Sequence, residues 1–164
     1  MSTALKDRYN LSFFKTFETA LHEVTPKVDT SHLFTQIFTN EFKEFELKQR
    51  MYHVTKVLHD VLDKDFPIAC NQLVQMTEAL KQLGVGENFE YMFLPDFVAT
   101  YGLNHFNTSI ETLAKITSFT SAEFAVRPFI IKYPNKAIAK MLEWSSHKDS
   151  KIRRLASEGS RPRL

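Results

Sequence analysis

The sequence predicts an all-α fold, an α-α superhelix (solenoid) of about nine helices. Glycine and proline are sparse, with four and six in 164 residues, whereas sheets with tight hairpins need more turn residues. Apolar residues such as Leu47, Met51, Val54 and Leu58 recur at spacings of three and four, the period of one helical face. Hydrophobic residues make up 43% and charged residues 24%, as in an ordinary globular protein, so we expect a single domain over residues 1–164.

The first half of the chain is expected to form four helices, each with apolar spacing and a boundary signal. Glu41, Glu44 and Glu46 are expected in the first turns of the third helix, where carboxylates suit the positive end of the helix dipole. Pro67 marks the start of the fourth, and the Gly84–Gly86 turn ends it. The four helices are predicted at Leu11–Leu21, from Thr30 or Ser31 to Phe38, from about Glu41 to just before Asp63, and from Pro67 to about Leu83.

The second half is expected to form five helices. Pro95 suits the first turn of one of them, and Gly102 lies just past its end. Pro128 is expected to interrupt the helix that Ser121 caps, and Trp144 falls on an apolar helical face that we expect in the core. These helices are predicted at Pro95–Tyr101, Asn104–Thr117, Ser121–Ile131, Pro134–Ser146 and from Asp149 or Ser150 to Glu158, with Gly159 ending the last.

The last two predicted helices look like a HEAT repeat. Their short connection favours an antiparallel pair. The segment DSKIRRLA, residues 149–156, has a capping Asp, an apolar residue, an Arg and a small residue in the order typical of the second helix of that repeat. No strict sequence period occurs, so any repeats are degenerate. A solenoid of HEAT-like repeats exposes a concave surface that suits extended partners.

Positive charge is concentrated at the C-terminal end. Residues 147–164 hold six basic and two acidic residues, whereas the remaining 146 residues hold 15 basic and 17 acidic ones. Such an asymmetry is typical of a chain with an anionic partner. The alternative is a basic tail that is only solvated.

Several chemistries are not supported by any motif. The six His residues lack metal-ligand spacing, and Gly84 and Gly86 lack the spacing of a nucleotide-binding loop, so we expect no metal, cofactor or nucleotide. The lone Cys70 is expected to be a buried, inert thiol in a reducing cytoplasm. Neither a signal peptide nor a membrane-spanning run is expected, which again favours a cytoplasmic protein without membrane contact.

Paired carboxylates and arginines are the remaining candidates for chemistry. Glu123 and Arg127 are four residues apart on one predicted helix, and Arg154 and Glu158 repeat this spacing on the last. Each pair therefore shares a helical face, close to a basic terminus. The alternative for each is an ordinary surface salt bridge worth about 0–1 kcal/mol.

Several stretches of the chain resemble a known family. SAEFAVRPFIIKYP and WSSHKDSKIRRLASEGSRPRL resemble the AlkC branch of the bacterial DNA alkylation-repair glycosylases. LKDRY, ELKQRMYHVTKVL and FLPDFVATYGLNHFNTSIETLAKITSFT are similar to the same family. The resemblance implies HEAT-like repeats that hold damaged double-stranded DNA. It also implies hydrolysis of the N-glycosidic bond of cationic bases such as 3-methyladenine and 3-methylcytosine, near the bacterial nucleoid, without a base-flipping pocket.

The same resemblance implies roles for residues. Glu123 and Glu158 are the candidate catalytic acids, and Arg154 is the candidate for contact near the lesion. Arg127, Arg161 and Arg163 would contact backbone phosphates or support the acids, and Lys148 and Lys151 would be peripheral phosphate contacts. In the family, RPRL is normally followed by Pro-Trp and further repeats, so the sequence is expected to be truncated after Leu164 relative to the family. The fragment could therefore lack activity.

Three functions compete at this stage. The first is the glycosylase or its N-terminal part. The second is a DNA-binding HEAT module without catalysis, which would bind DNA in a salt-sensitive way and excise nothing. The third is a helical-repeat scaffold for a protein, which would expose an apolar patch and bind DNA weakly. The sequence leaves the preferred base, the principal acid and the oligomeric state open.

Overall fold

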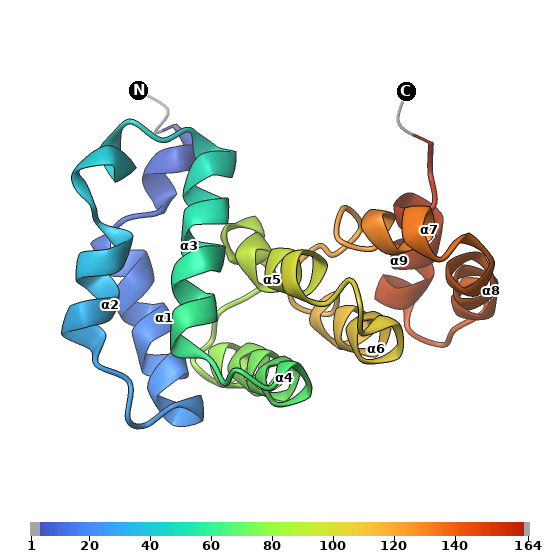
Figure 1. The fold of residues 1–164 in the computed structure, drawn as a ribbon, viewed down its shortest axis with the longest axis horizontal. Coiled ribbons are helices and arrows are strands. Elements are labelled where there is room, and N and C mark those ends of the chain that lie inside the picture. Colours follow the sequence, from blue (N-terminus) through green and yellow to red (C-terminus); the bar gives the residue numbers. More distant parts are fainter. Residues whose placement is uncertain (1–3, 163–164) are drawn as a thin grey trace. The chain divides into compact units, whose positions relative to one another are not determined.

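Every regular element in the described part of the chain is a helix. The computed structural model describes residues 4–162. Within this range nine α-helices and three short 3₁₀ helices follow one another without a β-strand (Figure 1). The predicted all-α class is therefore confirmed.

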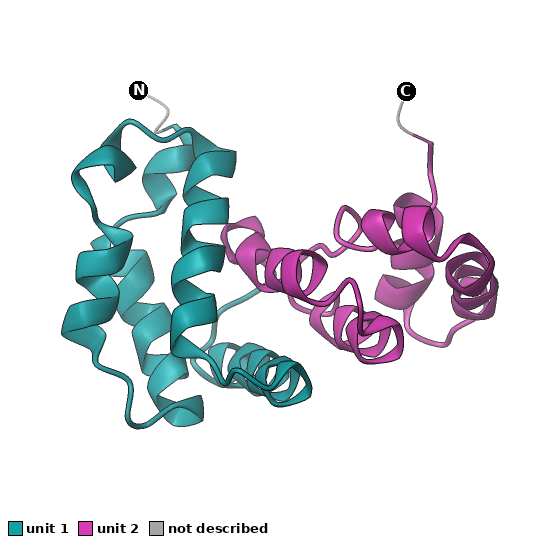
Figure 2. Ribbon diagram, in the orientation of Figure 1, with its two compact units in different colours: residues 1–86 teal, residues 87–164 magenta. Residues whose placement is uncertain are grey.

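The helices divide into two compact units, Met1–Gly86 (unit 1) and Glu87–Leu164 (unit 2), drawn in two colours in Figure 2. Unit 1 contains η1 (Leu5–Arg8), α1 (Leu11–Val24), α2 (Thr30–Ile37), η2 (Asn40–Lys43), α3 (Leu47–Val61) and α4 (Phe66–Gln82). Unit 2 contains η3 (Phe89–Met92), α5 (Phe93–Tyr101), α6 (Phe106–Ile116), α7 (Arg127–Lys132), α8 (Pro134–Ser145) and α9 (Ser150–Gly159). The single domain expected over residues 1–164 stays a prediction, and each unit is described by itself.

Aromatic side chains fill the core of unit 1, where α1 packs against α4 and α2 against α3. Phe14 and Phe17 of α1 are completely or almost completely buried. The ring of Phe14 meets those of Phe17 and Phe38 edge to face, with centroids 6.4 and 5.5 Å apart. Such edge contacts add to the stabilisation from burial alone. They account for part of the high phenylalanine content.

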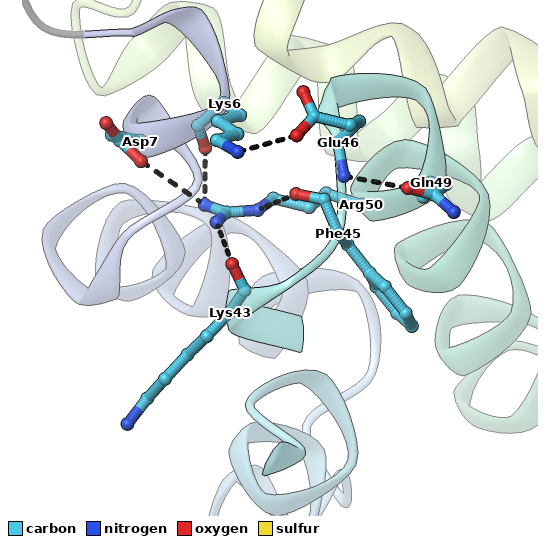
Figure 3. Close-up of polar contacts among 7 residues, drawn as sticks. All are labelled: Lys6, Asp7, Lys43, Phe45, Glu46, Gln49 and Arg50. Carbon is cyan, nitrogen blue, oxygen red and sulfur yellow. Dashed lines mark hydrogen bonds and ion pairs between the residues drawn. The ribbon is translucent and has the colours of Figure 1, made fainter. Parts of the chain in front are cut away.

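A buried arginine ties the N-terminal segments of unit 1 to α3 (Figure 3). The Arg50 guanidinium donates hydrogen bonds to the backbone carbonyls of Lys6 at 2.7 Å, Phe45 at 3.0 Å and Lys43 at 3.2 Å. Asp7 lies 3.8 Å from it, at the edge of an ion pair. A charged group can be buried at low cost when its donors are satisfied in this way.

The start of α3 differs from the prediction. The helix begins at Leu47 rather than near Glu41, which lies in η2. Glu46 is the residue before the first turn, and its backbone N–H donates to Gln49 Oε1 at 2.8 Å. Arg50 explains the difference, because it takes two backbone carbonyls of residues 43–45 as acceptors and so holds this segment in a non-helical bend.

Two helix caps test the predicted boundaries. α2 is capped by Asp29, whose side chain accepts from the His32 N–H at 3.1 Å, so the expected cap at Thr30 or Ser31 is wrong by one or two residues. α9 is capped by Asp149, one of the two residues expected, and this carboxylate accepts from the Lys151 N–H at 2.8 Å. Both acids satisfy an otherwise unpaired N–H of the first turn.

Successive helices pack against each other in unit 2. Helix α5 packs on α6, and α8 packs on both α7 and α9. The core includes Tyr91, Phe119 and Phe129, with the rings of Tyr91 and Phe119 5.2 Å apart. Trp144 is 5% exposed, as the sequence predicted. Burial, and secondarily the charge of Glu90, raises the pKa of Tyr91 well above its ordinary value.

The helix predicted over Ser121–Ile131 is wrong in its first half. Residues 121 and 122 have no regular structure and residues 123–126 form a turn, in which the Ala125 N–H donates to the Ala122 carbonyl at 3.0 Å, so α7 begins only at Arg127. Pro128 is the physical reason. It has no N–H for an i to i−4 bond, and inside a helix its ring would clash with the carbonyl one turn earlier. The proline therefore sits in the first turn of α7, where neither cost arises.

The membrane expectation can be examined for residues 4–162. Among them, no helix combines the length and the apolar character that a membrane crossing requires.

Candidate functional site

Glu123 is held in the turn that precedes α7, here called the Glu123 turn (residues 121–126). Its side chain is only 13% exposed. The Ser121 hydroxyl donates a hydrogen bond to Glu123 Oε2. A carboxylate that is both largely buried and hydrogen-bonded has a fixed direction, because few other positions satisfy its oxygens.

Arg154 of α9 is the cationic partner of Glu123. Its Nε lies 3.3 Å from Glu123 Oε1, although the two residues are far apart in sequence. The two ends of this ion pair differ in environment, since the Arg154 side chain is 63% exposed. The expected pairing of Glu123 with Arg127 on one helix is wrong, because the Glu123 turn is not helical.

Glu158 lies one helical turn after Arg154 on α9, as the spacing predicted. Its Oε2 forms an ion pair with Arg161 Nη1 at 3.2 Å, and its side chain is 37% exposed. Glu158 is thus the more hydrated of the two candidate acids. Arg154 therefore contacts one acid and shares a helix with the other.

A glycine brings α9 against the Glu123 turn. Gly159 lies inside α9 rather than just past its end, and its φ is not positive. A Cβ atom at this position would lie 2.5 Å from Val126 Cγ2, 3.5 Å from the Glu123 carbonyl oxygen and 3.9 Å from Glu123 Cα. The missing side chain therefore permits the close approach of the segment that carries Glu158 to the backbone of Glu123.

Arg127 is the first residue of α7 and is half-buried. Its Nε is buried and has no hydrogen-bond partner among residues 4–162. Buried donors are normally paired, so this nitrogen is an exception among the described residues.

The other predicted phosphate contacts lie at different places. Lys151 Nζ forms an ion pair with Glu87, and Lys148 is exposed in the connection between α8 and α9. The exposed Arg161 is paired with Glu158. Arg163 lies outside the described residues.

Two features of this site were missed from the sequence. Ser121 was expected to cap a helix, whereas it hydrogen-bonds the candidate acid. Gly159 was expected only to end α9. The role of Gly159 depends on segments that meet only in the folded chain, whereas Ser121 and Glu123 are two residues apart and their contact depends on the local turn.

The arrangement suits the stabilisation of positive charge. A largely buried carboxylate acts through a medium of lower dielectric constant than water, so its charge is felt more strongly. The arginine beside it suits phosphate oxygens. Within residues 4–162, no three His, Cys, Asp or Glu side chains are grouped so that they could hold a metal ion.

Comparisons with known proteins show what the chain resembles. No family model matches it. It is 36% identical over 160 residues to the Bacillus subtilis (strain 168) protein described as uncharacterized protein YhaZ, covering 98% of this chain and 43% of that protein. It superimposes with a TM-score of 0.89, at 34% sequence identity, on Pseudomonas fluorescens alkylpurine DNA glycosylase AlkC bound to DNA containing an abasic site analog.

Over its whole length the chain is similar to AlkC in both sequence and structure. The match to AlkC covers 100% of this chain and 44% of AlkC, so the chain spans less than half the length of the relatives that it matches. The family resemblance of the sequence and the helical-repeat fold are thereby confirmed. In this AlkC-like chain the roles of Glu123, Glu158 and the basic residues stay predictions.

Proposed function

We propose that the chain, or the longer protein to which it corresponds, is a DNA glycosylase that releases cationic alkylated bases such as 3-methyladenine and 3-methylcytosine from double-stranded DNA. One observation carries the proposal. In a chain related over its full length to AlkC, a largely buried carboxylate, Glu123, is held by a hydroxyl and by an arginine from another helix.

The chemistry needs little from the protein. A cationic alkylated base is already a good leaving group, so no general acid is required. The sugar develops positive charge as the bond breaks, and a fixed carboxylate stabilises that charge and can orient the attacking water. Glu123 suits this role better than Glu158, because its side chain is 13% rather than 37% exposed and its charge is less screened.

The basic residues would hold the DNA. The exposed Arg154 guanidinium lies next to Glu123 and would contact the backbone near the lesion. The remaining phosphate contacts would come from Arg127, Lys148, Lys151, Arg161 and Arg163. Lys151 and Arg161 would exchange a carboxylate partner for a phosphate, which costs little for exposed ion pairs. Such a repair enzyme would act on the bacterial nucleoid.

Excision by carboxamide variants tests the proposal. Glu123→Gln keeps the shape of the side chain and removes its charge, so release of 3-methyladenine from methylated duplex DNA should fall by about 100-fold or more. Binding to a duplex with an abasic site analog should change much less. Glu158→Gln should have the same type of effect, smaller in size because Glu158 is more hydrated.

Glu143→Gln is the matched control, since Glu143 is an exposed acid of unit 2 that pairs with Lys140 at 2.8 Å on α8. It should leave excision unchanged. Equal losses of binding and excision in Glu123→Gln would contradict a catalytic role for this acid.

A second function is supported by the exposure of Arg154 and Lys148, which makes cationic groups available whether or not Glu123 is catalytic. A module of this kind would bind DNA with strong salt dependence and excise nothing. Single-turnover excision with the unaltered chain separates the two functions.

A further inference from the structure

One face of α3 in unit 1 carries a stripe of polar and charged side chains, Lys48, Tyr52 and Lys56, here called the α3 stripe. Residues four apart lie almost above one another on a helix, and the two lysines are about 12 Å apart along its axis. All three side chains are exposed, and Tyr52 is 48% exposed. The opposite face of α3 is buried and includes Met51, Val54 and Leu58.

The stripe is a positive region in a unit without excess positive charge. Residues 1–86 hold ten basic and eleven acidic residues. Within α3, however, the first acid is Asp60, and its carboxylate lies 3.9 Å from Lys64 Nζ. At the other end, Glu46 is engaged by Lys6 at 2.7 Å.

The two lysines of the stripe are not neutralised in this way. Among residues 4–162, neither Lys48 nor Lys56 has an ion pair with a carboxylate, in contrast to Lys6, Lys64 and Lys81. Both ammonium groups are therefore available to an anionic partner. Two unpaired cations at the spacing of a helical ladder match a ligand with repeated negative charges, rather than a single anion.

We propose that the α3 stripe binds the phosphate backbone of duplex DNA. Lysine ammonium groups bind phosphate oxygens as point charges, and the Tyr52 hydroxyl can donate to a phosphate between them. Tyr52 is also the one large exposed side chain with apolar character on α3, all of which is described, so the face lacks the apolar area of a protein-docking surface. The inference rests on the proposed function in that both take DNA as the ligand.

A pair of double variants tests the stripe. Lys48→Ala/Lys56→Ala removes both cations, and Lys15→Ala/Lys27→Ala removes two exposed lysines elsewhere in unit 1, so the change in net charge is the same. Binding of the full chain to a fluorescent duplex with an abasic site analog is measured by anisotropy over a range of salt concentrations. An undamaged duplex of the same length is measured alongside.

Loss of two phosphate contacts should weaken binding about 10-fold or more near 0.1 M salt and reduce the slope of log K against log salt by roughly two. The loss should be equal for the damaged and undamaged duplexes, because backbone contacts carry no base information. The control pair should stay within about twofold of the unaltered chain. Circular dichroism melting checks that both double variants remain folded.

Equal DNA binding by the two double variants would overturn the proposal that the α3 stripe binds DNA, even if the unaltered chain excises 3-methyladenine as proposed. Conversely, the stripe variant could lose DNA binding while Glu123→Gln excises at the full rate. This result would support DNA binding by the α3 stripe and contradict the proposed catalytic role of Glu123. A loss of binding confined to the damaged duplex would also count against the stripe, since it would indicate an effect on lesion recognition.

Discussion

The close approach of α9 to the Glu123 turn can be tested by adding one methyl group at Gly159. The new Cβ atom would lie 2.5 Å from Val126 Cγ2, well inside van der Waals contact. Val126 cannot move aside easily, because it is completely buried and its branched side chain is restricted to few rotamers. Gly159→Ala should therefore separate α9 from the turn by a few tenths of an ångström or more.

The expected cost follows from two opposing effects. Overpacking of a dense core typically costs about 1–3 kcal/mol. Replacing glycine by alanine within a helix recovers at most about 1 kcal/mol, and less at Gly159 because it is the last residue of α9. The free energy of unfolding should therefore fall by about 1–2 kcal/mol. Urea denaturation followed by circular dichroism measures this change.

Val126→Ala provides the decisive comparison. Alone, it should destabilise the chain by about 2 kcal/mol, since it removes two buried methyl groups. Combined with Gly159→Ala it should cost less than the sum of the two, because the added methyl group fills the space that Val126 leaves. A coupling free energy of about 1 kcal/mol or more is expected. Additive losses, or a Gly159→Ala variant as stable as the unaltered chain, would refute the contact.

Two further predictions concern buried polar groups. Arg50→Met should lower the free energy of unfolding by about 2–4 kcal/mol, because three backbone carbonyls lose their donor. Asp7→Asn should lower it by about 0.5 kcal/mol or less, because Asp7 lies at the edge of the ion pair. Urea denaturation of both variants compares the two losses. Tyr91 has a pKa raised by burial, so it stays neutral in the folded chain while it ionises in the unfolded chain above about pH 10. Its contribution to stability is thus complete below that pH and is lost as the pH rises further, and absorbance at 295 nm should show Tyr91 ionising only together with unfolding.

The long, strongly periodic helices were predictable from the sequence alone. The α3 pattern of Met51, Val54 and Leu58 marks the buried face that the structure shows, and Asp149 marks the start of α9. These signals are local, because the residues that define a helical face lie within two turns of one another. The resemblance to the AlkC family was equally readable, since it is carried by continuous stretches of sequence.

The errors lie where one nearby residue overrides the helix propensity of a short segment. Residues 41–46 contain good helix formers, yet Arg50 donates hydrogen bonds to the carbonyls of Lys43 and Phe45, which therefore do not accept helical backbone bonds. The Glu123 turn likewise has helix-forming residues, and the proline after it leaves this segment outside α7. In both places one residue, Arg50 or Pro128, outweighs the intrinsic propensity of its neighbours, which amounts to less than about 1 kcal/mol per residue.

The same limit applies to the candidate site, because an ion pair predicted from i,i+4 spacing presupposes the helix. Once the Glu123 turn is not helical, Glu123 faces α9 and meets Arg154 instead. This exchange changes what the arginine can do. The contact to Glu123 uses Nε, whereas the terminal nitrogens of a guanidinium carry further donors in a fixed plane. A single arginine can therefore hold the acid in place and still present N–H groups to a phosphate in a fixed plane, whereas the three donors of a lysine share one nitrogen.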